Sequence, residues 1–228
     1  MENILKRTGS LAIVAGVSAM IILTAANGSR MPNAENPDAE HSQMYEWGAV
    51  QKSYSEERKD GSETAVIRGR SAEITETELE KAMDFYKLSG MSEEESEKAA
   101  VLHLEKREAL YQEAIANGFT VTDREVENYL RELKAVLYES DNKDEVFAVI
   151  EGFGSEEEYW DYEFTVYQKD LPIQKYTEDL QKKLSAQKGR AISQEEWTAY
   201  YEQLKNTLVE QQRYRKISDI SERENPGE

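Results

Sequence analysis

The residues that most often perform chemistry in proteins are scarce in this chain. It has 228 residues, no cysteine and two histidines, His41 and His103. Without cysteine there are no disulfides, no thiolate metal ligands and no cysteine nucleophile. His103 stands in an apolar stretch with no second helical histidine or suitably placed serine, which is typical of a partly buried or surface helical histidine. We therefore expect no catalytic residue.

Carboxylates are abundant, and three groups of them are contiguous: Glu93–Glu95, Glu156–Glu158 and Glu195–Glu196. A divalent-cation site is one interpretation, but calcium loops alternate their ligands and turn at a glycine. Each group stands at the start of an expected helix, where the helix dipole favours negative charge. Paired carboxylates for glycoside hydrolysis stay open as an alternative, although nothing places two of them across a cleft. We expect no metal and no cofactor.

Aromatic side chains are the most informative excess, with 13 Tyr, 3 Trp and 5 Phe. Five of them lie close together: Tyr159, Trp160, Tyr162, Phe164 and Tyr167. With 3.6 residues per turn, these five cover too wide an arc for one core face of a helix. We expect Trp160, Phe164 and Tyr167 in the core, because they share one stripe.

Tyr159 and Tyr162 lie off that stripe, so we expect them on the flank of a groove or in water. Tyrosines there would offer contact area and sequence-tolerant hydrogen bonds to a bound peptide. Met83 and Met91 could add an adaptable apolar surface. The candidate peptide-binding residues are therefore Tyr159, Tyr162, Met83 and Met91, and the alternative is that all are ordinary core or surface residues.

The charge balance excludes two classes of partner. Lys and Arg number 28 and Asp and Glu number 46, so the formal net charge is −18. Binding to phosphate backbones needs clustered cations, so we expect no nucleic-acid partner. Attachment to anionic lipid by charge is disfavoured for the same reason.

The N-terminus has the pattern of an export segment over residues 1–26. Lys6 and Arg7 precede an uncharged run from Leu11 to Ala26, as in a secretory signal peptide. The run has 16 residues, which is short for a spanning helix of about 17–25 residues. We expect either a cleaved signal peptide or a minimal membrane anchor; a buried cytosolic helix is the alternative. Both leading interpretations place the remainder outside the cytoplasm of a bacterium, anchored to the cell membrane or secreted.

Residues 27–63 are polar and interrupted by proline and glycine. Such a segment buries too little apolar surface to offset its ordering entropy. We expect a flexible linker there, in which Met44, Tyr45 and Trp47 either dock on the domain or stay exposed.

The rest of the chain is typical of an all-α fold with at most one short strand, at residues 64–69. Four capping boxes precede amphipathic runs: Thr75 with Glu78, Thr122 with Glu125, Ser155 with Glu158 and Ser193 with Glu196. The runs predict helices with apolar faces, such as Val126, Leu130, Leu133 and Leu137. Pro172 should kink a long helix that begins at Ser155. We expect a helical core over 64–188, a C-terminal helix over 189–217 and a disordered tail over 218–228.

The order of these elements resembles the N-terminal domain of the SurA and PrsA chaperone family over residues 64–210. The matching segments are Gly69, Ile74–Thr75 and Glu78–Leu79; Ala109–Ala114, Gly118, Val121–Asp123 and Glu125–Val126; Phe153–Trp160; and Ile192–Glu196 with Ala199–Tyr201. Their order and spacing carry the resemblance, since single capping boxes recur in many helical proteins. We expect no parvulin isomerase domain, because neither its histidine pair nor its glycine-rich motif is present.

The resemblance implies an extracytoplasmic, ATP-independent chaperone that binds unfolded or exported polypeptides without isomerase chemistry. Residues 1–26 would add a membrane contact if they are not cleaved. Two alternatives stay open: a peptidyl-prolyl isomerase of the same family, and an envelope assembly adaptor for one dedicated protein partner.

Overall fold

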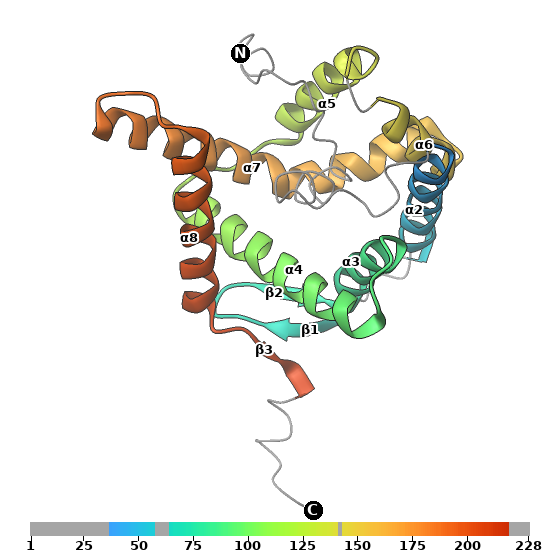
Figure 1. The fold of residues 1–228 in the computed structure, drawn as a ribbon, viewed down its shortest axis with the longest axis horizontal. Helices are drawn as coiled ribbons and strands as arrows, with labels where there is room; N and C mark the ends of the chain where they lie inside the picture. The colour runs from blue at the N-terminus through green and yellow to red at the C-terminus, as the bar shows by residue number, and fades with distance from the viewer. Residues whose placement is uncertain (1–36, 58–63, 141–142, 219–228) are drawn as a thin grey trace, which may run out of the picture. The chain divides into compact units, whose positions relative to one another are not determined.

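The computed structural model describes residues 37–57, 64–140 and 143–218. The expected export segment at residues 1–26 and nearly all of the expected tail at 218–228 lie outside the described residues. Within them the chain is predominantly helical, which confirms the expected fold class. The chain can be followed in Figure 1 from α2 in blue to α8 in red.

Seven helices and three short strands make up the described part of the chain. The helices are α2 (Pro37–Glu57), α3 (Glu76–Leu88), α4 (Glu93–Ala116), α5 (Asp123–Leu137), α6 (Lys143–Phe153), α7 (Glu156–Lys188) and α8 (Gln194–Gln212). The strands are β1 (Ala65–Arg68), β2 (Glu73–Thr75) and β3 (Arg215–Lys216). Helix α7 is continuous across Pro172, and the kink expected there stays a prediction.

The expectation of at most one strand is wrong. The strands form one antiparallel sheet in the order β2-β1-β3. Strand β1 pairs with β2 from Ala65 to Arg68 with a register shift, and it pairs with β3 through Ile67 and Arg68. Strands of two or three residues are too short to show an alternating pattern, so only β1 left a signal in the sequence.

The helix starts follow the capping pattern. Both hydrogen bonds of the capping box form at Ser92, Thr122 and Ser193, each with the glutamate three residues later. At Thr75 the backbone N–H likewise donates to Glu78, whose own N–H donates to the Thr75 hydroxyl. At Ser155 the Glu158 N–H donates to the hydroxyl, while the Glu158 carboxylate pairs with Lys52.

The flexible linker expected at 27–63 is wrong for residues 37–57, which form the 21-residue helix α2. Met44 and Trp47 are buried, so these two residues dock on the domain, whereas Tyr45 is exposed. The helix lacks a broad apolar face, and for that reason its periodicity did not mark it as part of a core.

The chain divides into two units rather than the one core expected at 64–188. Among the described residues, the first unit comprises 37–57, 88–90, 122–140 and 143–168 and contains α2, α5, α6 and the first part of α7. The second comprises 64–87, 91–121 and 169–218 and contains the sheet, α3, α4, the rest of α7 and α8. Each unit is described separately below.

In the first unit, α2 and α6 cross at two glycines. A Cβ atom built on Gly48 would lie 2.1 Å from the Val149 carbonyl oxygen, and one on Gly152 would lie 2.1 Å from the Tyr45 carbonyl oxygen. No side chain fits at either position, so the two helix backbones are in direct contact. The expected apolar face of α5 is also confirmed, because Val126, Leu130, Leu133 and Leu137 are all buried.

In the second unit, α4, α7 and α8 share one core, and the sheet lies along α4 (Figure 1). The buried members are Ala109, Leu110, Ala114, Tyr176 and Leu208. The alanines of α4 allow close approach, and Tyr176 fills the space with its ring 5.5 Å from that of Phe119. This core holds the part of α7 that belongs to the second unit. A group of charged side chains lies in the first turn of that part.

Candidate functional site

Tyr159 does not lie where the sequence placed it. It is one of the most completely buried side chains of the chain, so the expectation that it faces a groove or water is wrong. Its ring packs edge-on against Phe153 with centroids 5.5 Å apart. Tyr162 is half-buried, and its hydroxyl donates to the Gln51 side-chain oxygen at 2.9 Å.

The error came from a charged residue inside the core. Tyr159, Glu163 and Tyr167 lie at positions i, i+4 and i+8 of α7, and all three are buried. The expected core stripe ran through Trp160 and Phe164, which are only half-buried, whereas the buried stripe contains a glutamate and so gives no continuous apolar pattern. Of the three residues expected in the core, Tyr167 alone is buried.

The two methionines belong to the other unit. Met83 on α3 is half-buried, and Met91 directly before α4 is 41% exposed. The structure therefore assigns two candidates to the first unit and two to the second, and in the first unit Tyr159 and Tyr162 both contact Phe153. Tyr159, at least, cannot contact a partner without rearrangement of the first unit.

Helices α2 and α7 of the first unit carry polar side chains that are withdrawn from solvent, and a hydrogen bond from Tyr162 to Gln51 joins the two helices. Gln51, Tyr159 and Glu163 are almost fully removed from solvent, and Tyr162 bonds Gln51. Burial, and after it the nearby Glu163 carboxylate, raises the pKa of the Tyr159 hydroxyl well above its ordinary value. The Gln51 amide nitrogen has no hydrogen-bond partner in the structure. Buried polar groups of this kind cost stability when they are incompletely bonded.

In the second unit, five charged side chains from α3, α4 and α7 form a connected cluster. The Lys169 ammonium lies 2.9 Å from a Glu78 oxygen and 2.7 Å from a Glu108 oxygen. The Arg107 guanidinium lies 2.8 Å from Asp170 and 3.6 Å from Glu108. Glu108 is buried between the two cations.

Glu78 and Lys169 favour each other's charged form. Burial alone would raise the pKa of Glu78, but Lys169 and the Thr75 N–H outweigh it and lower that pKa. Burial would lower the pKa of Lys169, but Glu108 and Glu78 outweigh it and raise that pKa. Through these ion pairs the cluster joins α7 to α3 and α4.

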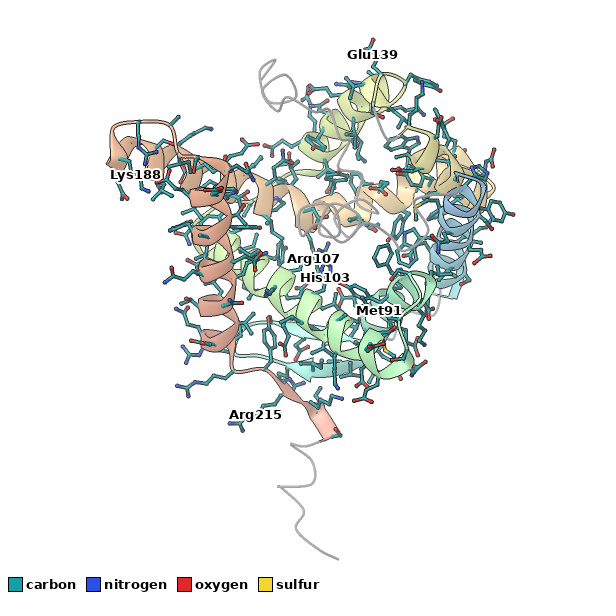
Figure 2. The ribbon with its side chains drawn as sticks, viewed as in Figure 1. Met91, His103, Arg107, Glu139, Lys188 and Arg215 are labelled. Atoms are coloured by element: carbon teal, nitrogen blue, oxygen red, sulfur yellow. The ribbon has the colours of Figure 1, made fainter. Side chains whose placement is uncertain are left out.

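His103 lies one turn before Arg107 on α4, and both side chains are visible in Figure 2. Burial, and then the charges of Arg107, Lys205 and Lys106, lowers the pKa of His103 to about 4. The imidazole is thus neutral at pH 7. It is half-buried, as the sequence indicated, and stands among cations rather than beside a nucleophile.

Four large apolar side chains are exposed in the described residues, and the sequence analysis did not name two of them, Tyr138 and Leu102. Tyr138 is 64% exposed, Leu102 51%, Tyr45 46% and Met91 41%. The Tyr138 ring, at the end of α5, lies 5.4 Å from that of the half-buried Phe147 on α6. Tyr138 directly follows the last residue of an apolar stripe, and this was the only signal in the sequence that could have marked it.

The three contiguous groups of glutamates lie at the starts of helices. Glu93–Glu95, Glu156–Glu158 and Glu195–Glu196 all lie in first turns, as expected. Across residues 37–57, 64–140 and 143–218 no group of three or more potential ligands could hold a metal ion. In the same ranges no helix combines the length and the apolar character that crossing a membrane requires.

Comparison with known proteins adds no relative: no family model, curated protein or solved structure matches this chain.

Proposed function

We propose that this chain is a non-enzymatic, ATP-independent chaperone that binds unfolded or exported polypeptides outside the cytoplasm. The proposal keeps the resemblance of residues 64–210 to the SurA N-terminal domain, from a short strand through the capped helices to α8. In this interpretation the described part of the chain acts on its clients through contact alone.

The observation that carries the proposal is the exposure of large apolar side chains on a strongly acidic protein. Tyr138, Leu102, Tyr45 and Met91 offer aromatic, branched and thioether surface to solvent. Such side chains adapt to many sequences, since they need no fixed hydrogen-bond geometry. The net charge of −18 would keep complexes soluble and favour clients with basic segments.

The aromatic pair Tyr138 and Phe147 is the best-defined contact point in the first unit. Phe147 supports one side of the Tyr138 ring, so the ring is ordered before a client arrives. An ordered aromatic side chain loses little conformational entropy on binding, which favours affinity.

The test is suppression of aggregation of a chemically denatured client on dilution, with a proline-peptide isomerisation assay alongside. We expect suppression at near-stoichiometric amounts and no acceleration of isomerisation. Tyr138→Ala should weaken client binding about fivefold or more, because interface tyrosines often contribute more than about 1 kcal/mol. Glu139→Ala, at the neighbouring exposed position, is the matched control and should leave binding nearly unchanged.

Absence of suppression by the wild-type protein would refute the proposal. Turnover of the proline peptide well above background would favour the isomerase, and one tight stoichiometric partner recovered from the cell envelope would favour the adaptor.

A further inference from the structure

Helix α2 contacts the rest of the first unit through a narrow stripe. Among its described side chains, residues 41–54, the buried ones are Met44, Trp47, Gly48 and Gln51. These positions correspond to i, i+3, i+4 and i+7. That spacing is the pattern by which an amphipathic helix docks into a groove on a partner protein.

The contact is shaped for a helix with a small residue at its centre. Gly48 meets the Val149 carbonyl and Gly152 with no space for a Cβ atom on either side. Met44 and Trp47 precede this crossing as the large apolar anchors, and Gln51 follows it. The surface of α6 therefore favours a helix whose backbone can come close to it, in addition to favouring particular side chains.

Polar contacts complete the attachment of α2. The Tyr162 hydroxyl donates to Gln51, and the Gln43 amide donates to the Leu88 carbonyl at 3.0 Å. The His41 Nε2 atom lies 3.4 Å from a Glu151 oxygen on α6, and the Lys52 ammonium pairs with Glu158 on α7 at 3.0 Å. Water or another chain can replace the charged contacts to Glu151 and Glu158 at small cost, because ion pairs near the surface contribute little net stability.

The face beneath α2 is rich in aromatic surface. Tyr162 contacts Phe153, whose ring lies 5.4 Å away, and Phe153 in turn contacts Tyr159. Tyr159 and Tyr162 are the two first-unit residues whose type suggested peptide binding. Departure of α2 would remove the Gln51 partner of the Tyr162 hydroxyl and uncover the surface of α6 around Val149 and Gly152.

We propose that this face of α6 and α7 is a binding surface for amphipathic helical segments of clients, and that α2 occupies it as an internal stand-in. The inference rests on the proposed function, of which it names the site and the client conformation. The preferred segment carries apolar anchors at i and i+3, a glycine at i+4 and a polar residue at i+7. A tethered helix competes at an effective concentration near millimolar, so only clients that bind well displace it.

Hydrogen exchange of the wild-type protein is the first test. If α2 is a releasable stand-in, the amides of residues 41–54 exchange through openings that leave α5 and α6 protected. We expect at least tenfold faster exchange in α2 than in those two helices. Exchange of all three helices at one common rate would overturn the proposal without any substitution.

The second test weakens the docking of α2 and leaves the surface beneath it unchanged. Gly48→Val inserts a side chain where none fits. Ala49→Val introduces the same valine side chain at an exposed position of the same helix. The probe is a labelled synthetic peptide of residues 37–57. We expect it to bind the Gly48→Val protein at least tenfold more tightly than the wild-type and Ala49→Val proteins.

The same three proteins enter the aggregation assay. We expect Gly48→Val to suppress aggregation at lower concentration than the other two. Equal suppression by all three, with no peptide bound to Gly48→Val, would overturn the inference and leave the proposed function standing. No suppression by any of them would overturn the proposed function itself. If Gly48→Val unfolds the first unit, the wild-type exchange result decides.

Discussion

Tyr159 and Tyr138 are two tyrosines of the first unit with opposite surroundings, and they make a matched pair. Tyr159 is fully buried against Phe153, whereas Tyr138 is mostly exposed. We expect Tyr159→Ala to lower the free energy of unfolding by about 3–5 kcal/mol, as for other large aromatic residues in cores. Tyr138→Ala should change it by less than about 0.5 kcal/mol.

Urea denaturation followed by circular dichroism measures both effects. Equal destabilisation by the two substitutions would contradict the burial that separates them. The comparison also separates stability from client binding, because only Tyr138 can be removed without disturbing the core.

His103 should make stability depend on pH. Its pKa is 6.5 as an ordinary histidine and about 4 in the folded chain, so the unfolded chain binds a proton first as pH falls. Its contribution is therefore fully present above about pH 6.5 and is lost between about pH 6.5 and 4. The loss is at most about 3 kcal/mol.

His103→Gln removes this titration, so the stability difference between wild type and variant should narrow or invert as pH falls from 7 to 4.5. His41→Gln is the control, since His41 is an exposed residue. Parallel stability curves for the wild-type and His103→Gln proteins over that range would show that His103 does not titrate as its surroundings indicate.

At the scale of an element, the capping boxes are independent local devices. Thr122 begins α5, and its side chain accepts the Glu125 N–H while Glu125 accepts the Thr122 N–H. We expect Thr122→Ala to lower the free energy of unfolding by about 1 kcal/mol, because it leaves helix-terminal N–H groups without a partner.

Thr120→Ala is the matched control two residues earlier in the same exposed loop, and it should have an effect within about 0.5 kcal/mol. Thermal melts of both variants compare the two losses directly. A larger loss at position 120 would mean that the cap is not what stabilises this end of α5.

At the scale of the whole molecule, the division into two units should be visible in how stability is lost. Glu108 lies in the second unit, buried between Lys169 and Arg107. We expect Glu108→Gln to lower the free energy of unfolding by about 2–3 kcal/mol. This is less than for a fully buried pair, because Lys169 keeps contact with solvent.

Hydrogen exchange resolved by segment shows where the loss falls. Faster exchange should concentrate in α4 and α8, while α2 and α6 change less, because they belong to the other unit. Glu94→Gln, which breaks the exposed pair with Lys98, is the control and should change little. An equal increase in all four helices would mean that the two units unfold as one.

The sequence by itself determined the helical class, the helix starts and the buried face of α5. Those features depend on hydrogen bonds within four residues and on the 3.6-residue period, both of which are local. Segment 37–57 and the orientation of α7 were decided only by the tertiary structure. Helix α2 is ordered by Gly48 meeting Gly152 on α6, and a backbone contact between distant glycines leaves no periodic signal.

The same reason explains the candidate site. Nothing in the sequence pattern marked Glu163 or Glu108 as a core residue, yet both are buried. A charge enters a core only where distant groups compensate it, as Lys169 and Arg107 do for Glu108. Because those partners come from other parts of the chain, the sequence could name the tyrosines of α7 as unusual but could not tell which of them faced inward.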